Sequence, residues 1–223
     1  MDTNNHPESE EKFLLALHSS TDALGVGILK LGSKSQEQKT AVFPLGRKLS
    51  NELFNCIEEI LPSEYWNRIS RISVATGPGG FTGTRLTISL ARTLAQQLIC
   101  PLDGFSSFYL MVNRLSKLLG TEKKLSPFWI TTHLKRRGIV AGKYQIEYSH
   151  NNFIKNIIEI EKPHLIAKNS NLHPSLVATD DIQKDIIELI NHCHFAYKMK
   201  KESPWQKVLP IYPTSPVDNL NEK

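Results

Sequence analysis

A glycine-rich segment at residues 77–83 has the composition best suited to chemistry, because four of its seven residues are glycine. Ile69, Ile72, Val74 and Ala75 predict a short buried strand before this segment, and a helical pattern follows it from Leu86 to Leu98. Glycine tolerates positive φ, and a glycine turn that leads into a helix N-terminus can surround a phosphate group. The candidate phosphate-binding loop consists of Gly77, Pro78, Gly79, Gly80 and Gly83.

The two specific phosphate-binding motifs are absent from this segment. A dinucleotide fingerprint would need a third glycine where Thr82 stands. A P-loop would need Lys followed by Ser or Thr where Thr84 and Arg85 stand. The loop is therefore a general candidate for phosphate and predicts neither nucleotide-binding class.

The histidine, cysteine and serine residues that could bind a metal ion or act as a nucleophile are not spaced for either role. His192, Cys193 and His194 are adjacent, and neighbours on a helix point about 100° apart, so they are not expected to bind one metal ion. Ser19 and Ser20 are not accompanied by a recognisable histidine and carboxylate. The sequence therefore predicts no catalytic residue and no metal ligand.

The helix after the glycines has a broad apolar surface. Leu90, Leu94, Leu98, Ala91, Ala95 and Ile88 cover roughly 200° of its circumference, whereas a helix on one face of a sheet needs a stripe of about 100°. The additional surface is covered either by another layer of this chain or by another protein.

The composition is that of an ordinary globular protein. The chain has 223 residues, 40% hydrophobic and 22% charged, with a net charge of +5. This excess permits contact with nucleic acid but also fits a solvated lysine-rich surface. Cys56, Cys100 and Cys193 are too few for a disulfide framework, and we find neither a membrane span nor a signal peptide, so we expect a cytoplasmic protein.

Predicted elements alternate along the chain. Three strands within residues 13–43 are followed by a helix at 49–61, a strand at 69–76, a helix at 84–99, a short strand at 101–103 and a helix at 106–119. Weaker strands at 127–131, 138–148, 153–160 and 175–178 precede a helix at 181–196. We predict an α/β fold with mixed sheets flanked by helices. The expected organisation is an extension at 1–12, a first lobe at 13–122, a second lobe at 123–207 and a tail at 208–223.

The glycine segment and its helix, GPGGFTGTRLTISLARTLAQQL, resemble the G-P-G-S-F-T-G-x-R signature and following helix of the TsaB (YeaZ) family. The resemblance covers roughly residues 13 to 213 and ends on Val208-Leu-Pro-Ile-Tyr-Pro213, similar to the closing P-x-Y of that family. It implies an actin-like, ribonuclease-H-like fold of two lobes. It also implies a role as the non-catalytic partner of TsaD, a paralogue of similar fold, in tRNA threonylcarbamoyladenosine synthesis.

Three positions depart from the family pattern. His18 replaces the aspartate that ends the first strand, and a neutral or cationic imidazole cannot offer Mg²⁺ an anionic oxygen. Leu49 and Ser50 stand where relatives have a histidine followed by Ser or Thr. Arg136, Arg137 and Gly138 match the basic turn of relatives, whereas Leu134 and Ile139 replace its acidic residues. This turn is either a solvated loop or a contact for phosphate or tRNA.

By resemblance, the first helix and the helix after the glycines pack against the equivalent helices of TsaD in a four-helix bundle. The implied interface comprises Leu49, Leu53, Phe54, Ile57, Ile60, Phe81, Thr82, Arg85, Leu86, Ile88, Leu90, Ala91, Leu94, Ala95 and Leu98. The wider complex would include the ATPase TsaE, a homodimer could form in isolation, and tRNA contact would be indirect. No cofactor is expected on this chain alone, and ATP or ADP stays open at the complex interface. The alternatives are an actin-like ATPase or phosphotransferase, a homodimeric binding module and a peptidase.

Overall fold

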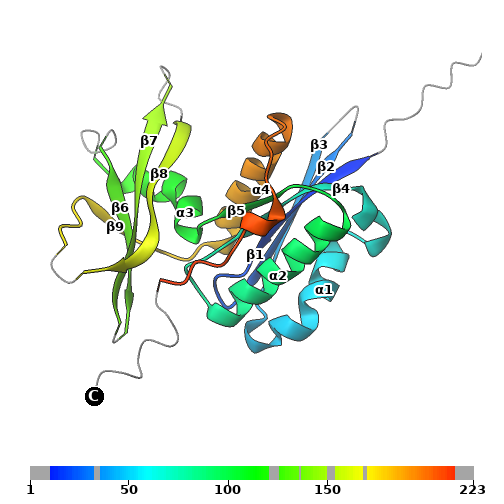
Figure 1. The fold of residues 1–223 in the computed structure, drawn as a ribbon, viewed down its shortest axis with the longest axis horizontal. Helices are drawn as coiled ribbons and strands as arrows, with labels where there is room; N and C mark the ends of the chain where they lie inside the picture. The colour runs from blue at the N-terminus through cyan, green and yellow to red at the C-terminus, as the bar shows by residue number, and fades with distance from the viewer. Residues whose placement is uncertain are drawn as a thin grey trace, which may run out of the picture.

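The computed structural model describes residues 11–32, 36–120, 126–135, 137–149, 154–167 and 170–213. Two β-sheets stand beside each other with helices against them, and the C-terminal segment passes between the two halves (Figure 1). Residues 1–10 of the predicted extension and residues 214–223 of the predicted tail lie outside this range. The predicted α/β fold with two mixed sheets is confirmed.

The larger sheet has the strand order β3-β2-β1-β4-β5. Its strands are β1 (Lys12–His18), β2 (Leu24–Leu31), β3 (Gln36–Phe43), β4 (Ile69–Ala75) and β5 (Leu102–Phe105). The first three pair antiparallel, whereas β1, β4 and β5 run parallel. β1 is an unbroken apolar run because, as the central strand, it is covered on both faces.

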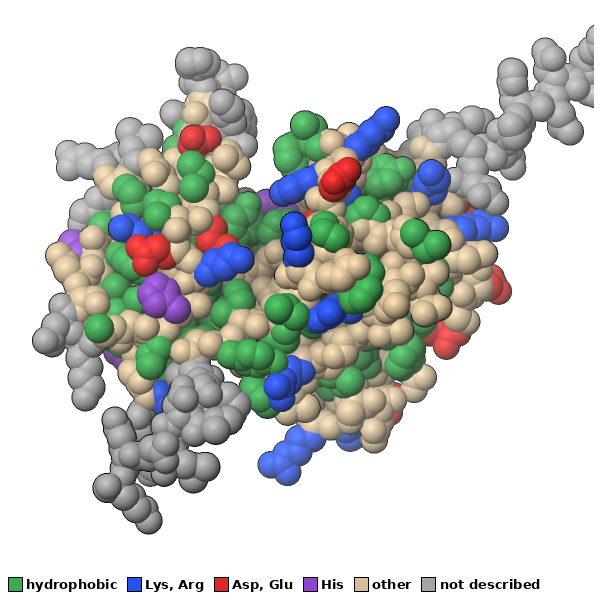
Figure 2. Space-filling view, viewed as in Figure 1, with side chains coloured by type: hydrophobic (Ala, Val, Ile, Leu, Met, Phe, Trp, Pro, Cys, Tyr) green, Lys and Arg blue, Asp and Glu red, His purple; other side chains and the backbone are tan. Residues whose placement is uncertain are grey.

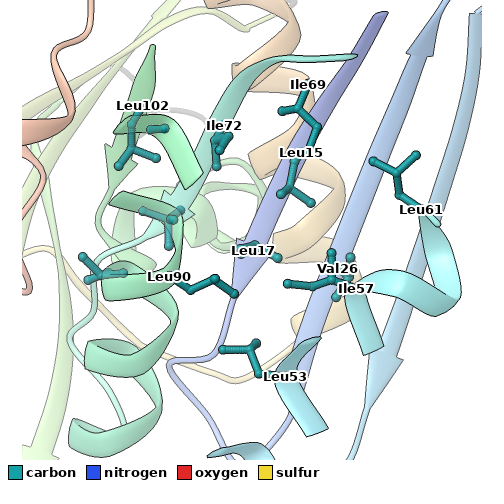
Figure 3. Close-up of a cluster of buried hydrophobic side chains, with 14 of the residues drawn as sticks. Leu15, Leu17, Val26, Leu53, Ile57, Leu61, Ile69, Ile72, Leu90 and Leu102 are labelled. Carbon is teal, nitrogen blue, oxygen red and sulfur yellow. The ribbon is translucent and has the colours of Figure 1, made fainter. Parts of the chain in front are cut away.

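Helices cover both faces of the larger sheet. α1 (Leu49–Ile60) and α2 (Phe81–Gln97) lie on one face, and α4 (Ile182–Lys198) lies on the other (Figure 1). Figure 3 shows the core between the first two helices and the strands, where Leu53, Ile57 and Leu90 point toward Leu15 and Leu17. This core fixes the orientation of both helices.

The smaller sheet has the order β8-β7-β6-β9. It consists of β6 (Phe128–Leu134), β7 (Gly138–Tyr148), β8 (Ile154–Ile166) and β9 (Ser175–Val177). α3 (Ser107–Leu115) packs on it through Phe108, Met111 and Val112. Ser106 is the N-cap of α3, and its hydroxyl accepts a hydrogen bond from the Tyr109 N–H at 3.0 Å.

α4 belongs to the predicted range of the second lobe but packs against the first sheet. Its Ile186 and Ile190 lie over Gly25 and Gly27 of β2, where an added Cβ would come within 3.3 Å of the Ile186 side chain. The chain therefore returns to the first lobe at α4. It stays there afterwards, because Val208, after the short 3₁₀-helix η5 (Trp205–Lys207), is buried in the first core.

One buried ion pair joins β4 to β5. Arg71, 2% exposed, donates from Nε and Nη2 to Asp103 at 2.6 and 2.9 Å, and from Nη1 to the Lys201 carbonyl at 2.8 Å. The pair thus connects the parallel strands to the turn after α4.

The three cysteines are buried free thiols. None of the helices in the described ranges combines the length and the apolar character needed to cross a membrane.

Candidate functional site

The glycine segment packs tightly against the turn that follows β1. The Gly80 N–H donates to the Ser20 carbonyl at 2.7 Å, and an added Cβ on Gly79 would lie only 2.1 Å from the same oxygen. Gly77 has a φ of +91° and precedes a cis bond to Pro78. At Gly77 the glycine is explained by positive φ, and at Gly79 by the close approach of two backbones.

Gly83 lies inside the helix rather than in the predicted loop, because α2 begins at Phe81. A Cβ on Gly83 would lie 2.8 Å from the Ser19 carbonyl oxygen and 3.1 Å from a methyl group of Leu49. The missing side chain therefore allows α2 to pack against both the turn after β1 and the start of α1.

His18 ends β1 and is 1% exposed. Burial lowers the pKa of His18 to about 4, so the ring is neutral at physiological pH. The adjacent Ser19 hydroxyl pairs with the Thr87 hydroxyl at 2.6 Å rather than with a histidine. Within the described ranges, no three His, Cys, Asp or Glu side chains come together as a metal site.

His192, Cys193 and His194 face three different environments. The His192 ring stacks on Phe105 with centroids 5.1 Å apart, and burial raises the pKa of the Cys193 thiol to about 12. His194 Nε2 lies 3.3 Å from the Gln36 amide nitrogen. The divergence expected for helix neighbours is what the structure shows.

The apolar surface of α2 is covered largely by this chain itself, which is the first of the two alternatives that the sequence left open. Ile88, Leu90, Ala91 and Ala95 are buried in the first core. α1 lies on one side of α2, and on another side η5 contributes Trp205, whose ring lies 5.3 Å from the Arg92 guanidinium. The sequence did not identify this cover because η5 follows α2 by about a hundred residues.

The predicted interface residues therefore divide into three groups. Phe54, Phe81, Thr82 and Arg85 are exposed, Ile60, Leu86, Leu94 and Leu98 are partly buried, and Leu49, Leu53, Ile57, Ile88, Leu90, Ala91 and Ala95 are buried. Members of the last group shape the surface from beneath and are not available for direct contact.

The two-helix surface is the part of α1 and α2 that stays accessible. We define it by Phe54 of α1, by Phe81, Thr82, Arg85, Ser89 and Thr93 of α2, and by Tyr212 of the C-terminal segment. α2 contains no acidic residue, and Figure 2 shows hydrophobic, uncharged and basic side chains over it. Short side chains at Ser89 and Thr93 allow another helix to approach closely.

Aromatic rings and one arginine form a cluster at the N-terminal end of α2. Phe81 is 45% exposed, and the Arg85 guanidinium lies 4.0 Å from its ring centroid. Tyr212 lies 5.5 Å from Phe81 and accepts a hydrogen bond from Arg85. On α1, Phe54 is 55% exposed and stacks on Trp66. Aromatic residues and arginine are enriched in protein interfaces, where acidic residues are depleted.

Tyr212 and Trp66 are members of this surface region that the sequence reasoning missed. The closing P-x-Y segment was a signal for Tyr212, but nothing in the pattern indicated that it reaches Phe81. For Trp66 we find no signal.

The basic turn is only partly described. Lys135 and Arg137 are exposed beside the turn between β6 and β7, whereas Arg136, Lys123 and Lys124 lie outside the described residues. The turn belongs to the second lobe, and the two-helix surface belongs to the first.

Fold and site together define a two-lobed α/β protein of the actin-like class, in which a buried neutral histidine ends the first strand.

Comparisons with known proteins agree with this class. The profile of the family described as TsaD, tRNA N6-adenosine threonylcarbamoyltransferase, matches residues 34–147. The tRNA threonylcarbamoyladenosine biosynthesis protein TsaB of Buchnera aphidicola is 25% identical over 185 residues, which cover 80% of this chain and 78% of that protein. TsaB of Bacillus subtilis is 30% identical over 102 residues, 42% of this chain and 41% of that protein.

Among solved structures, YeaZ from Pseudomonas aeruginosa superposes with a TM-score of 0.61 at 18% identity, covering 90% of this chain and 100% of that one. At this identity the likeness establishes the fold alone. The profile match covers about half of the chain, and the similar curated proteins are TsaB proteins. The chain therefore belongs to the TsaB (YeaZ) family within the TsaD-type domains.

Proposed function

We propose that this chain acts in tRNA threonylcarbamoyladenosine biosynthesis, as a subunit that binds and supports a TsaD-type threonylcarbamoyltransferase without performing the transfer itself. The observation that carries this proposal is the two-helix surface, an acid-free helix face flanked by exposed aromatic rings on a TsaB-family fold.

The partner would place its own pair of helices against α1 and α2. Phe81 and Phe54 are exposed although each could bury a large apolar area, and rigid aromatic side chains are frequent binding hot spots. The buried residues beneath them keep the surface preformed, which lowers the entropic cost of association.

The support for a non-catalytic role lies at the end of β1. Metal-bound phosphate chemistry in this class uses a carboxylate there, whereas His18 is buried and neutral. We therefore place ATP or ADP, if the complex holds one, at the interface with the partner. The proposed setting is the cytoplasm, with TsaE as a further component and with indirect contact to tRNA.

The test is the formation of modified tRNA adenosine by the TsaD of the same organism, with and without this chain. We expect strong stimulation by the wild type and its loss with Thr93→Arg, which puts a bulky charge on the two-helix surface. Asn191→Arg, an exposed position on α4 at the opposite face of the sheet, is the matched control and should stimulate normally. Full activity of TsaD alone would refute the proposal.

A homodimer through the same surface is the second candidate, because the acid-free α2 with exposed aromatic rings beside it can also face its own copy. Sedimentation of the isolated chain tests this. Dissociation of the homodimer on addition of TsaD would show that the two associations share one surface. A dimer that TsaD leaves intact would indicate a separate binding module.

A further inference from the structure

A cavity of about 540 Å³ lies between the two lobes and adjoins the two-helix surface, with which it shares Phe81 and Tyr212. The turn after β1, the glycine segment, α3, the β6–β7 region and residues 210–213 all contribute to its lining. This volume is within the range of roughly 300–1,000 Å³ that is usual for small-molecule sites.

Three buried polar atoms of the lining residues lack a hydrogen-bond partner. They are Nε2 of His18, Oγ of Ser20 and Oγ1 of Thr84, on residues that are 1%, 7% and 4% exposed. Four such side-chain atoms occur in the described part of the chain, and three of them belong to residues that line this one cavity. An unsatisfied buried polar group costs about 1–3 kcal/mol, so a ligand whose acceptor atoms reached these groups would gain free energy by pairing with them.

All three groups can act as neutral hydrogen-bond donors. The Ser20 backbone N–H donates to His18 Nδ1 over a long distance of 3.4 Å, which leaves the hydrogen of the neutral ring on Nε2. Burial keeps the pKa of this ring near 4, so the tautomer persists at physiological pH. Ser20 and Thr84 each have a hydroxyl hydrogen that can rotate toward an acceptor.

The rest of the lining indicates what kind of acceptor would enter. Charged lining residues are Lys135 and Arg137 against a single carboxylate, Asp180, which favours an anion. The walls carry the large apolar side chains of Phe108 and Met111. An occupant would therefore combine an oxyanion with a compact apolar body.

We propose that this cavity binds a small molecule with a carboxylate or phosphate group attached to an apolar body, with His18, Ser20 and Thr84 donating to its oxygen atoms. Binding is a property of the isolated chain and does not rest on the proposed partnership with TsaD.

The experiment titrates the isolated full-length chain with benzoate and phenyl phosphate, which separate the two oxyanion sources. Benzyl alcohol and benzylamine are the neutral and cationic controls of similar size. Calorimetry gives affinity, and thermal unfolding gives the shift in midpoint. We expect at least one of the two anions to bind and both controls to bind at least tenfold more weakly.

Two threonines of α2 provide matched variants. Thr84→Val removes a hydroxyl without a partner, so it should leave the unfolding midpoint unchanged or raised while weakening the anion about tenfold. Thr87→Val removes a hydroxyl that is already paired with Ser19, so it should lower the midpoint and leave anion affinity intact. Ser20→Ala is a second variant expected to weaken the anion.

Failure of both anions to bind at 10 mM would overturn the proposal. So would equal binding of the neutral control, or an affinity that neither Thr84→Val nor Ser20→Ala changes.

Discussion

Phe81 allows the two-helix surface to be tested by a single truncation. Its side chain is 45% exposed, and the ring contacts Tyr212 and Arg85, so Phe81→Ala removes these contacts together with the buried part of the side chain. The aromatic contact contributes about 0.5–1.5 kcal/mol beyond area burial. The part of the side chain that this chain already buries, roughly 80–140 Å², is worth about 2–3.5 kcal/mol at about 25 cal/mol per Å², so the free energy of unfolding should fall by about 2–4 kcal/mol.

The loss of binding is a separate quantity, which is set by the exposed part of the ring. An aromatic side chain buries about 150–250 Å², so the exposed 45% of Phe81 corresponds to roughly 70–110 Å² that a partner could cover. At about 25 cal/mol per Å², this area is worth roughly 1.7–2.8 kcal/mol, or about 20- to 100-fold in Kd.

Calorimetric titration of TsaD from the same organism into wild type and Phe81→Ala measures this difference. Phe195→Ala is the matched control, since Phe195 is 66% exposed but lies on α4, on the opposite face of the sheet. Its Kd should stay within about twofold of the wild type. Equal Kd values for wild type and Phe81→Ala would refute the assignment of this surface, and so would a comparable loss with Phe195→Ala.

Three further predictions concern the framework that holds the site. Asp103→Asn should lower the free energy of unfolding by about 3–5 kcal/mol, because it leaves the Arg71 guanidinium buried without its carboxylate. In urea unfolding, the double variant Arg71→Met/Asp103→Leu should recover much of this loss. A loss below 1 kcal/mol for Asp103→Asn would contradict the prediction. Gly79→Ala should lower the free energy of unfolding by about 1–3 kcal/mol, because its Cβ would lie 2.1 Å from the Ser20 carbonyl oxygen. Gly80→Ala should be tolerated, because its Cβ would lie 3.7 Å from the same oxygen. Equal melting temperatures for the two variants would contradict this prediction. Burial lowers the pKa of His192 from 6.5 to about 4, so its neutral folded form stabilises the protein above pH 6.5, and this contribution is lost as the pH falls toward 4. His18 titrates over the same range, so His192→Phe should reduce the slope of stability against pH there without abolishing it. An unchanged slope would contradict the contribution of His192.

The sequence was sufficient for the order and type of the main elements, because their patterns are local. β1 could be recognised from its unbroken apolar run, and α2 from its helical repeat after the glycines. The reason for Gly79 could not be recognised, since it depends on the approach of the Ser20 carbonyl from a turn about sixty residues earlier.

Long-range packing also explains what the sequence left undecided at the candidate site. The apolar positions on α2 predict an apolar face wider than one sheet can cover. They do not indicate which part of the chain covers the remainder, and the structure shows that Trp205, beside Arg92, contributes to that cover. In the same way, α4 was assigned to the second lobe because it follows the second-lobe strands in sequence. It packs on the first sheet, where Gly25 and Gly27 lack side chains and leave room for Ile186 and Ile190. The exposed residues Phe54, Phe81, Thr82 and Arg85 were identified from the resemblance, and their exposure needed the structure.

The most direct test of the central claim is the mass of the species formed when this chain is mixed with the TsaD of its own organism. Size-exclusion chromatography with light scattering should give a complex of one copy of each, with 25.2 kDa contributed by this chain. Separate elution of the two proteins at tens of micromolar would contradict the claim that the two-helix surface exists to bind that partner.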